Sequence, residues 1–177
     1  IDERYYTREN IKRGLRNIDG SGVFAGVSKI GSVQGYYMVD GDRVAQPGHL
    51  YYRGIDVEEI VRAHRAENTF GYEEVAYLLL CGELPDAEEM ARFQNALSQA
   101  KALPAGFFEN EIFRSPGQNI MNSLARGVLA LYNYDPCPED LSVENSFLQS
   151  ISLIARIPTI VALSYAMKRH YYYNDSL

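Results

Sequence analysis

The chain has 177 residues, of which 46% are hydrophobic and 23% are charged, and its formal net charge is −6 at pH 7. This length is typical of one domain and allows roughly 70% of the unfolded chain's surface to be buried. The acidic balance argues against a nucleic-acid-binding protein, which would carry a basic stripe.

The first 53 residues predict a helix followed by a small β region. Residues 5–18 are charged and weakly amphipathic, which favours a helix. From residue 27 to residue 53, short runs of Val, Ile and Tyr alternate with glycines, a pattern typical of strands. Asp40-Gly41 is a dipeptide preferred in type I′ hairpin turns, so we expect the chain to reverse there.

Helix-start signals begin at Asp56. Asp56 with Glu59, and Asp86 with Glu89, have the spacing of a capping box. We therefore expect a helix to begin after each aspartate.

The helices that follow are predicted from their stop signals and apolar stripes. A helix beginning near residue 72 should end at Gly82, with Pro85 beyond it. The next helix, which begins after Asp86, has apolar residues at helical spacing: Met90, Phe93, Leu97 and Ala100. A helix over 117–132 has its stripe at Ile120, Met121, Leu124, Val128 and Leu131, and Ala125 and Gly127 leave room for another backbone.

The last helix should start near Glu139 or Ser142 and run to about His170. It is apolar on more than one side, so we expect it to be buried all round. Part of this burial would come from the missing C-terminal portion of the protein, from a second subunit, or from both. A membrane span is the alternative, but Arg156 near the centre would cost roughly 2.5–3.5 kcal/mol in a bilayer. Pro158 should kink the helix or end its first half.

Four sequence blocks, in order, carry a resemblance to a known family. They are GVSKI at 26–30, LYYRGIDVEEI with FGYEEVAYLLLCGELP at 50–85, NIMNSL at 119–124, and residues 145–162 with LIARIPT inside. These blocks resemble citrate synthase, although many members have a His-Pro-Met helix start where this chain has 119–124. The resemblance covers nearly the whole chain.

The resemblance implies a mainly helical, all-α fold with a small N-terminal β-hairpin region. It places 1–177 as a single N-terminal part of the family's large domain: a helix and linker at 1–26, a small β region at 27–55, and a helical body at 56–177. The parent enzyme would condense acetyl-CoA with oxaloacetate and water to give citrate and CoA, without a metal or redox cofactor. A homodimer would form through the helices near 117–132 and 142–170.

The resemblance assigns no catalytic residue to this chain. Family members use a carboxylate base, two histidines and carboxylate-binding arginines, and the first catalytic histidine precedes a glycine. Here the histidines precede other residues: His49, His64 and His170 are followed by Leu, Arg and Tyr. We interpret His49 as a loop residue, His64 as solvated and His170 as a helix C-cap, and we assign no catalytic, substrate-binding, cofactor-binding or metal residue.

The other candidate residues favour structural interpretations. Arg53 could bind a carboxylate but fits better as an arginine that bridges a strand end to its neighbours. Cys81 and Cys137 form no C-x-x-C pair, so we expect two reduced thiols. The glycines at 20, 22 and 26 are spaced one residue too long for a dinucleotide-binding fingerprint.

The hypothesis is therefore an inactive N-terminal fragment of a cytoplasmic citrate synthase. It would supply scaffold and dimer-interface helices to a missing C-terminal half, and contact neither nucleic acid nor membrane. The charged start lacks a secretory signal, which agrees with that location. Two alternatives stay open: a fragment of a 2-methylcitrate synthase, which uses propionyl-CoA, and a non-catalytic helical oligomerisation module.

Overall fold

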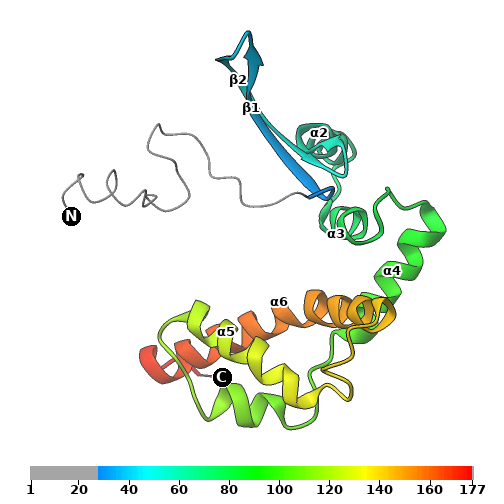
Figure 1. Cartoon of the computed structure of the whole chain (residues 1–177). Helices are drawn as coiled ribbons and strands as arrows, with labels where there is room; N and C mark the ends of the chain where they lie inside the picture. Colours follow the sequence, from blue (N-terminus) through cyan, green and yellow to red (C-terminus); the bar gives the residue numbers. More distant parts are fainter. Residues whose placement is uncertain (1–27, 177) are drawn as a thin grey trace, which may run out of the picture. The chain divides into compact units, whose positions relative to one another are not determined.

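The computed structural model describes residues 28–176 (Figure 1). They divide into two compact units, with the boundary between Ile60 and Val61. The first unit holds the sheet and the second is helical, so the prediction of a mainly helical fold with a small N-terminal β region is confirmed. The helix predicted at 5–18 lies outside the described residues, and the single-domain assignment stays a prediction.

The sheet is an antiparallel hairpin extended by a short third strand. β1 (Gly31–Val39) pairs with β2 (Asp42–Tyr52), and β2 pairs with β3 (Ile55–Asp56). Asp40 and Gly41, with φ of 50° and 92°, connect β1 to β2, which confirms the predicted type I′ turn. Residues 28–30 lie before β1 and are not in a strand, so among the described residues the sheet begins later than the β region predicted from residue 27.

A second two-residue turn follows β2. Arg53 and Gly54 both have positive φ, 50° and 88°, and the residues that flank them pair across the strands. The Arg53 backbone N–H also donates to the Ile30 carbonyl at 2.8 Å. The Arg-Gly block of the sequence is thus a tight reversal that brings the chain from β2 to β3.

Helix α2 (Val57–Glu67) begins directly after the sheet. The Asp56 carboxylate accepts a hydrogen bond from the Glu58 N–H at 2.9 Å. Asp56 is therefore a helix cap, but it bonds the second residue of the helix, and the predicted capping box with Glu59 is not formed.

The next two helices follow the predicted signals. α3 (Tyr72–Cys81) ends at Gly82, which has φ of 98° and donates its N–H to the Leu78 carbonyl at 2.9 Å. α4 (Ala87–Ala100) starts with a complete capping box: the Asp86 carboxylate accepts from the Glu89 N–H at 2.8 Å and the Glu89 carboxylate accepts from the Asp86 N–H at 2.9 Å. Both predictions are confirmed.

The C-terminal helices form the body of the second unit. They are a π-helix, η1 (Phe108–Phe113), then α5 (Ile120–Leu131), a 3₁₀ turn, η2 (Tyr132–Tyr134), and α6 (Val143–Tyr173). Asn119 caps α5, so this helix starts later than residue 117, where we expected it. Pro158 lies inside α6, and the alternative that it ends the helix is wrong.

Two apolar clusters hold the second unit together, and α6 contributes to both. The first contains Ala76, Phe93, Leu97, Ile151 and Ala155, and the second contains Phe107, Ile112, Leu131, Ile160 and Met167. In Figure 1, α5 and α6 lie side by side, and η1 packs against both. α6 is therefore the element against which α4, α5 and η1 pack.

The close approach of α5 and α6 is made at Gly127. A Cβ at this position would lie 2.9 Å from the Ile160 Cγ2 and 3.9 Å from the Phe107 Cζ. The room predicted at Gly127 is thus filled by a side chain rather than by a backbone. Along the predicted stripe, Met121 is 72% exposed, whereas Leu131 is buried.

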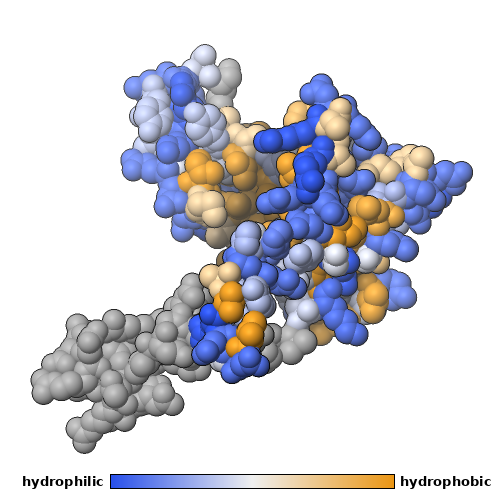
Figure 2. Space-filling view, turned by 90° about the horizontal axis from the view of Figure 1, so that it is seen from above, coloured by the Kyte–Doolittle hydropathy of each residue, from blue (hydrophilic) through white to orange (hydrophobic). Residues whose placement is uncertain are grey.

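Much of α6 stays uncovered. Its buried residues are Ile151, Ala155, Ile160, Ser164 and Met167. Among the described residues it is the one helix long and apolar enough to cross a membrane, a test that core helices of soluble proteins also pass, and 17% of its most apolar stretch is buried. Figure 2 shows further apolar side chains on the surface of the described chain. Within residues 28–176 the helix is only partly covered, and the cover that we expected from outside this chain stays a prediction.

Candidate functional site

The three histidines considered from the sequence each have a local partner. His49 lies in β2 and not in a loop as we expected. Its Nδ1 is 2.9 Å from the Asp56 Oδ2, and its ring stacks on Tyr51. The same carboxylate that caps α2 thus also fixes His49 against the sheet.

His64 joins α2 to α3. Its Nε2 lies 2.6 Å from the Glu74 Oε2, and its Nδ1 lies 2.8 Å from the Thr69 Oγ1. Its ring occupies the space beside Gly71, where a Cβ would come within 2.6 Å of the Nε2. The His64 side chain is 19% exposed, so the expectation of a solvated histidine is wrong.

His170 lies in the last turn of α6. Its Nδ1 is 2.9 Å from the Asp175 backbone carbonyl, just beyond the Asn174 residue that ends the helix at φ of 56°. Arg169 forms an ion pair with the Asp175 carboxylate, which raises the pKa of this arginine chiefly through their hydrogen bond. His170 therefore stabilises the helix end, the role that we expected from its position.

Between residues 28 and 176, no group of three or more His, Cys, Asp or Glu side chains is placed to hold a metal ion. Cys81 and Cys137 are exposed and not disulfide-bonded, as predicted. Sequence reasoning assigned no site residue, and the geometry brings none of its candidate residues together within either unit.

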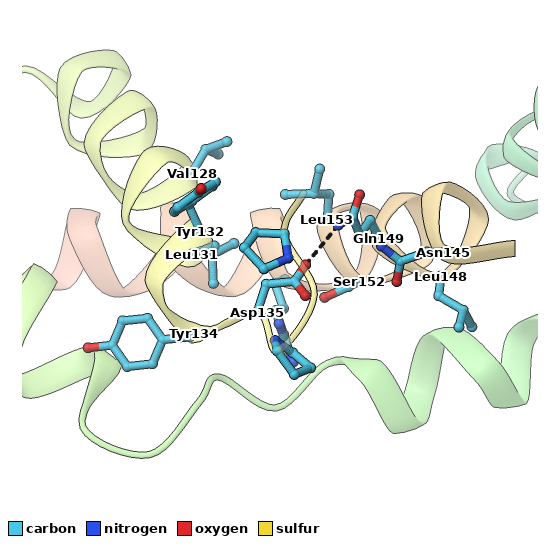
Figure 3. A pocket seen from close by; sticks show the side chains of 13 residues that line it. Val128, Leu131, Tyr132, Tyr134, Asp135, Asn145, Leu148, Gln149, Ser152 and Leu153 are labelled. Carbon is cyan, nitrogen blue, oxygen red and sulfur yellow. Dashed lines mark hydrogen bonds between the residues drawn. The ribbon is translucent and has the colours of Figure 1, made fainter. Parts of the chain in front are cut away.

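The second unit contains one sizeable cavity, which the sequence did not indicate. It has a volume of about 430 Å³ and lies between the end of α5, the loop after η2 and the first half of α6 (Figure 3). Its apolar wall comprises Val128, Leu131, Leu148, Leu153, Pro136 and Pro138, and its polar residues are Tyr132, Tyr134, Asp135, Asn145, Gln149, Ser152 and Arg156.

Hydrogen bonds from α6 fix the loop that closes this cavity. The Asp135 Oδ2 accepts from the Gln149 amide at 3.0 Å, and its Oδ1 accepts from the Cys137 N–H at 2.8 Å. The Asn145 amide donates to the carbonyls of Cys137 and Asp140 at 3.0 and 2.8 Å. The loop backbone is therefore held by side chains of α6, which gives the cavity a defined wall.

Two further polar groups at the cavity have defined partners. The Tyr132 hydroxyl donates to the Glu139 carboxylate, and this hydrogen bond together with the negative charge raises the pKa of Tyr132. The Arg156 Nε donates to the Ala102 carbonyl at 3.1 Å. The residues that line the cavity include no histidine. The sequence signal that could have indicated this cavity is Arg156, an arginine within an otherwise apolar helix.

Comparison with known proteins gives one consistent family. A family model described as citrate synthase, C-terminal domain, matches residues 18–177. A citrate/2-methylcitrate synthase of Bacillus subtilis is 28% identical over 120 residues, which are 68% of this chain and 31% of that protein. A glyoxysomal citrate synthase of Cucurbita maxima is 32% identical over 135 residues, covering 72% of this chain and 24% of that protein.

Solved structures agree with the sequence comparison. The crystal structure of citrate synthase from Pyrobaculum aerophilum superimposes with a TM-score of 0.67 at 25% identity, and the match covers 88% of this chain and 38% of that one. The chain thus spans about a quarter to two fifths of the length of these relatives.

Proposed function

This chain belongs to the citrate synthase family, and from that premise we propose that it is the N-terminal part of an enzyme that condenses acetyl-CoA with oxaloacetate and water to give citrate and CoA. The order of the blocks at 50–85, 119–124 and 145–162 supports this placement. The chain covers 31% of the Bacillus subtilis relative and 38% of the Pyrobaculum aerophilum structure. This supports the view that most of the enzyme lies outside this chain.

Within that enzyme, we propose a scaffold role for this part. The single observation that carries it is that His49, His64 and His170 are each committed to a neighbouring side chain or carbonyl. The reaction requires a base for the acetyl methyl group and donors for the developing enolate and the ketone, and these groups would come from the remainder of the enzyme. The reaction would proceed without a metal or redox cofactor.

The activity test uses the isolated chain with acetyl-CoA and oxaloacetate. Consumption of the thioester is followed by its ultraviolet absorbance rather than with a thiol reagent, because the exposed Cys81 and Cys137 would react with such a reagent. We expect no turnover from the chain. An authentic citrate synthase, assayed in parallel as the positive control, should show full turnover. Turnover by the chain alone, with either acetyl-CoA or propionyl-CoA, would refute the scaffold role.

The scaffold would also provide a homodimer interface through the helices near 117–132 and 142–170. Support comes from apolar side chains left uncovered on both helices: Leu129 on α5 and Val143 and Leu148 on α6 are exposed. Apolar residues gathered on one surface are typical of protein–protein interfaces.

Sedimentation velocity tests this interface with a matched pair of variants. The unmodified chain should sediment as a dimer, and Leu129→Asp should convert it to a monomer. Phe70→Asp is the control, because Phe70 is also highly exposed and apolar but lies between α2 and α3. A monomeric unmodified chain would contradict the proposal. So would an equal weakening of the dimer by both variants.

We also place the enzyme in the cytoplasm, away from membranes and nucleic acid. The acidic balance and Arg156 at the centre of α6 support this, since both disfavour the alternative partners. Cell fractionation of a tagged parent protein tests the location, and recovery in the membrane pellet after a high-salt wash would contradict it.

A further inference from the structure

Arg156 brings an uncompensated positive charge to the cavity between α5 and α6. The residue is half-buried, and its Nε–H is fixed on the Ala102 carbonyl. Within residues 28–176, no aspartate or glutamate forms an ion pair with it. A charge that is partly removed from water is unfavourable until an opposite charge approaches it, so the cavity favours an anion.

The carboxylate already present in the cavity does not meet this need. Asp135 accepts hydrogen bonds from the Gln149 amide and the Cys137 N–H, and these neutral donors hold it in place. Its distance from the Arg156 nitrogens exceeds that of an ion pair, since no such pair joins them. The guanidinium thus keeps donors available for a group that enters from outside.

Ser152 stands beside Arg156 on the same face of α6. The two residues are four positions apart, the spacing that makes side chains neighbours on a helix, and both line the cavity. A serine hydroxyl donates one hydrogen bond, and the guanidinium has up to four N–H donors besides the one on Ala102, so the pair can hold both oxygens of one carboxylate.

Beside these polar residues, the cavity has an apolar wall. Val128 and Leu131 face it from α5, and Leu148 and Leu153 from α6, as Figure 3 shows. Its volume of about 430 Å³ lies within the range of small-molecule sites, which combine apolar walls with a few polar groups. A ligand that suits these walls has an anionic head and an apolar body.

We propose that this cavity is a binding site for a small amphipathic carboxylate, with its head on Ser152 and Arg156 and its aliphatic body against the leucines of α5 and α6. This site is separate from the proposed citrate synthesis, and Leu148 is shared between its wall and the surface proposed for the dimer. A cationic ligand would be repelled by Arg156, and a neutral one would leave the guanidinium without a counter-charge.

The test uses nuclear magnetic resonance of the whole chain, labelled with ¹⁵N, and four probes. Hexanoate carries the predicted head and body, hexylammonium reverses the charge, hexanol removes it, and acetate removes the body. We expect hexanoate to shift the amide signals of residues 131–135, 137 and 148–156, and the other three probes to bind at least about tenfold more weakly, which is about 1.4 kcal/mol.

Variants then connect the binding to the named side chains. Arg156→Gln should weaken hexanoate at least about tenfold, Ser152→Ala should weaken it less, and Arg156→Lys should retain most of the affinity because the charge remains. Arg126→Gln is the matched control, since Arg126 also donates to a backbone carbonyl, that of Ser115, but lies outside this cavity.

Three results would each overturn the site. They are unchanged affinity in Arg156→Gln, equal binding of hexylammonium, and hexanoate shifts that fall outside the cavity residues. If Arg156→Gln fails to fold, the Ser152→Ala and Arg156→Lys variants and the four probes still decide the question.

Discussion

Replacing Gly127 with alanine should have two opposite effects on the free energy of unfolding, because Gly127 lies at the contact between α5 and α6. Alanine is favoured over glycine in a helix by about 0.8–1 kcal/mol. The new Cβ, however, would lie 2.9 Å from the Ile160 Cγ2, closer than two carbon atoms can pack. The outcome depends on whether Ile160 can move.

The surroundings of Ile160 indicate that it cannot move cheaply. Ile160 and Phe107 are both fully buried, and the Phe107 ring also faces the new Cβ at 3.9 Å. The methyl group in question branches from the Cβ, where isoleucine is stiff in a helix. Overpacking of this kind costs about 1–3 kcal/mol, so the cost exceeds the gain and we expect a net loss of about 1 kcal/mol.

Urea unfolding followed by far-ultraviolet circular dichroism measures this change. Ala125→Gly is the control, because Ala125 is exposed on the same helix and its replacement measures the propensity term alone, a loss of about 1 kcal/mol. Combining Gly127→Ala with Ile160→Ala should destabilise less than the sum of the two single changes. A Gly127→Ala variant that is more stable by about 1 kcal/mol would refute the close approach.

Two further predictions concern the junctions at either end of α3. Gly71→Ala should displace the His64 ring from Glu74 and lower the thermal midpoint, with an expected cost of about 1–3 kcal/mol, and His64→Ala in the same chain should remove most of the added penalty. Burial, together with Cys81 and Glu89 nearby, raises the pKa of Tyr77 from 10.0 to about 12. The folded state holds the Tyr77 proton more tightly than the unfolded state, so the resulting stabilisation is complete below pH 10 and is lost as the pH rises towards 12. The urea midpoint should therefore fall between pH 10 and pH 12. It should fall less in Tyr77→Phe, which has no phenol proton to lose. Equal slopes in the two proteins would contradict the assignment.

The features predicted correctly from the sequence depend on short-range rules. The type I′ turn at Asp40-Gly41, the C-cap at Gly82 and the capping box at Asp86 each involve residues within four positions of one another. Such features follow from backbone conformations that the residues themselves favour, so the rest of the fold does not need to be known.

The errors arose where a partner lies on another element. His64 belongs to a charged helix face, and only the position of Glu74 in α3 removes it from solvent. Met121 shares a periodic stripe with Leu131, but Met121 is 72% exposed while Leu131 is buried. Periodicity predicts which residues share a face, whereas burial depends on which neighbours cover that face.

The candidate cavity could not be predicted for a related reason. Its wall combines α5, a loop and α6, and the loop takes its shape from Asn145 and Gln149, whose amides bond carbonyls and a carboxylate several residues away. Neither amide belongs to a motif with a known function. Arg156 is visible in the sequence, but its charge becomes informative only when the absence of an ion pair within residues 28–176 is known.

The uncovered length of α6 has a consequence for biosynthesis. A helix of 31 residues that exposes apolar side chains such as Val143, Leu148 and Tyr165 is a surface that can promote aggregation at high concentration. The yield of folded protein in a cell should therefore depend on how quickly a complementary surface reaches this helix after translation. Supply of that surface, more than the intrinsic stability of the chain, would then set how much of the polypeptide escapes proteolysis.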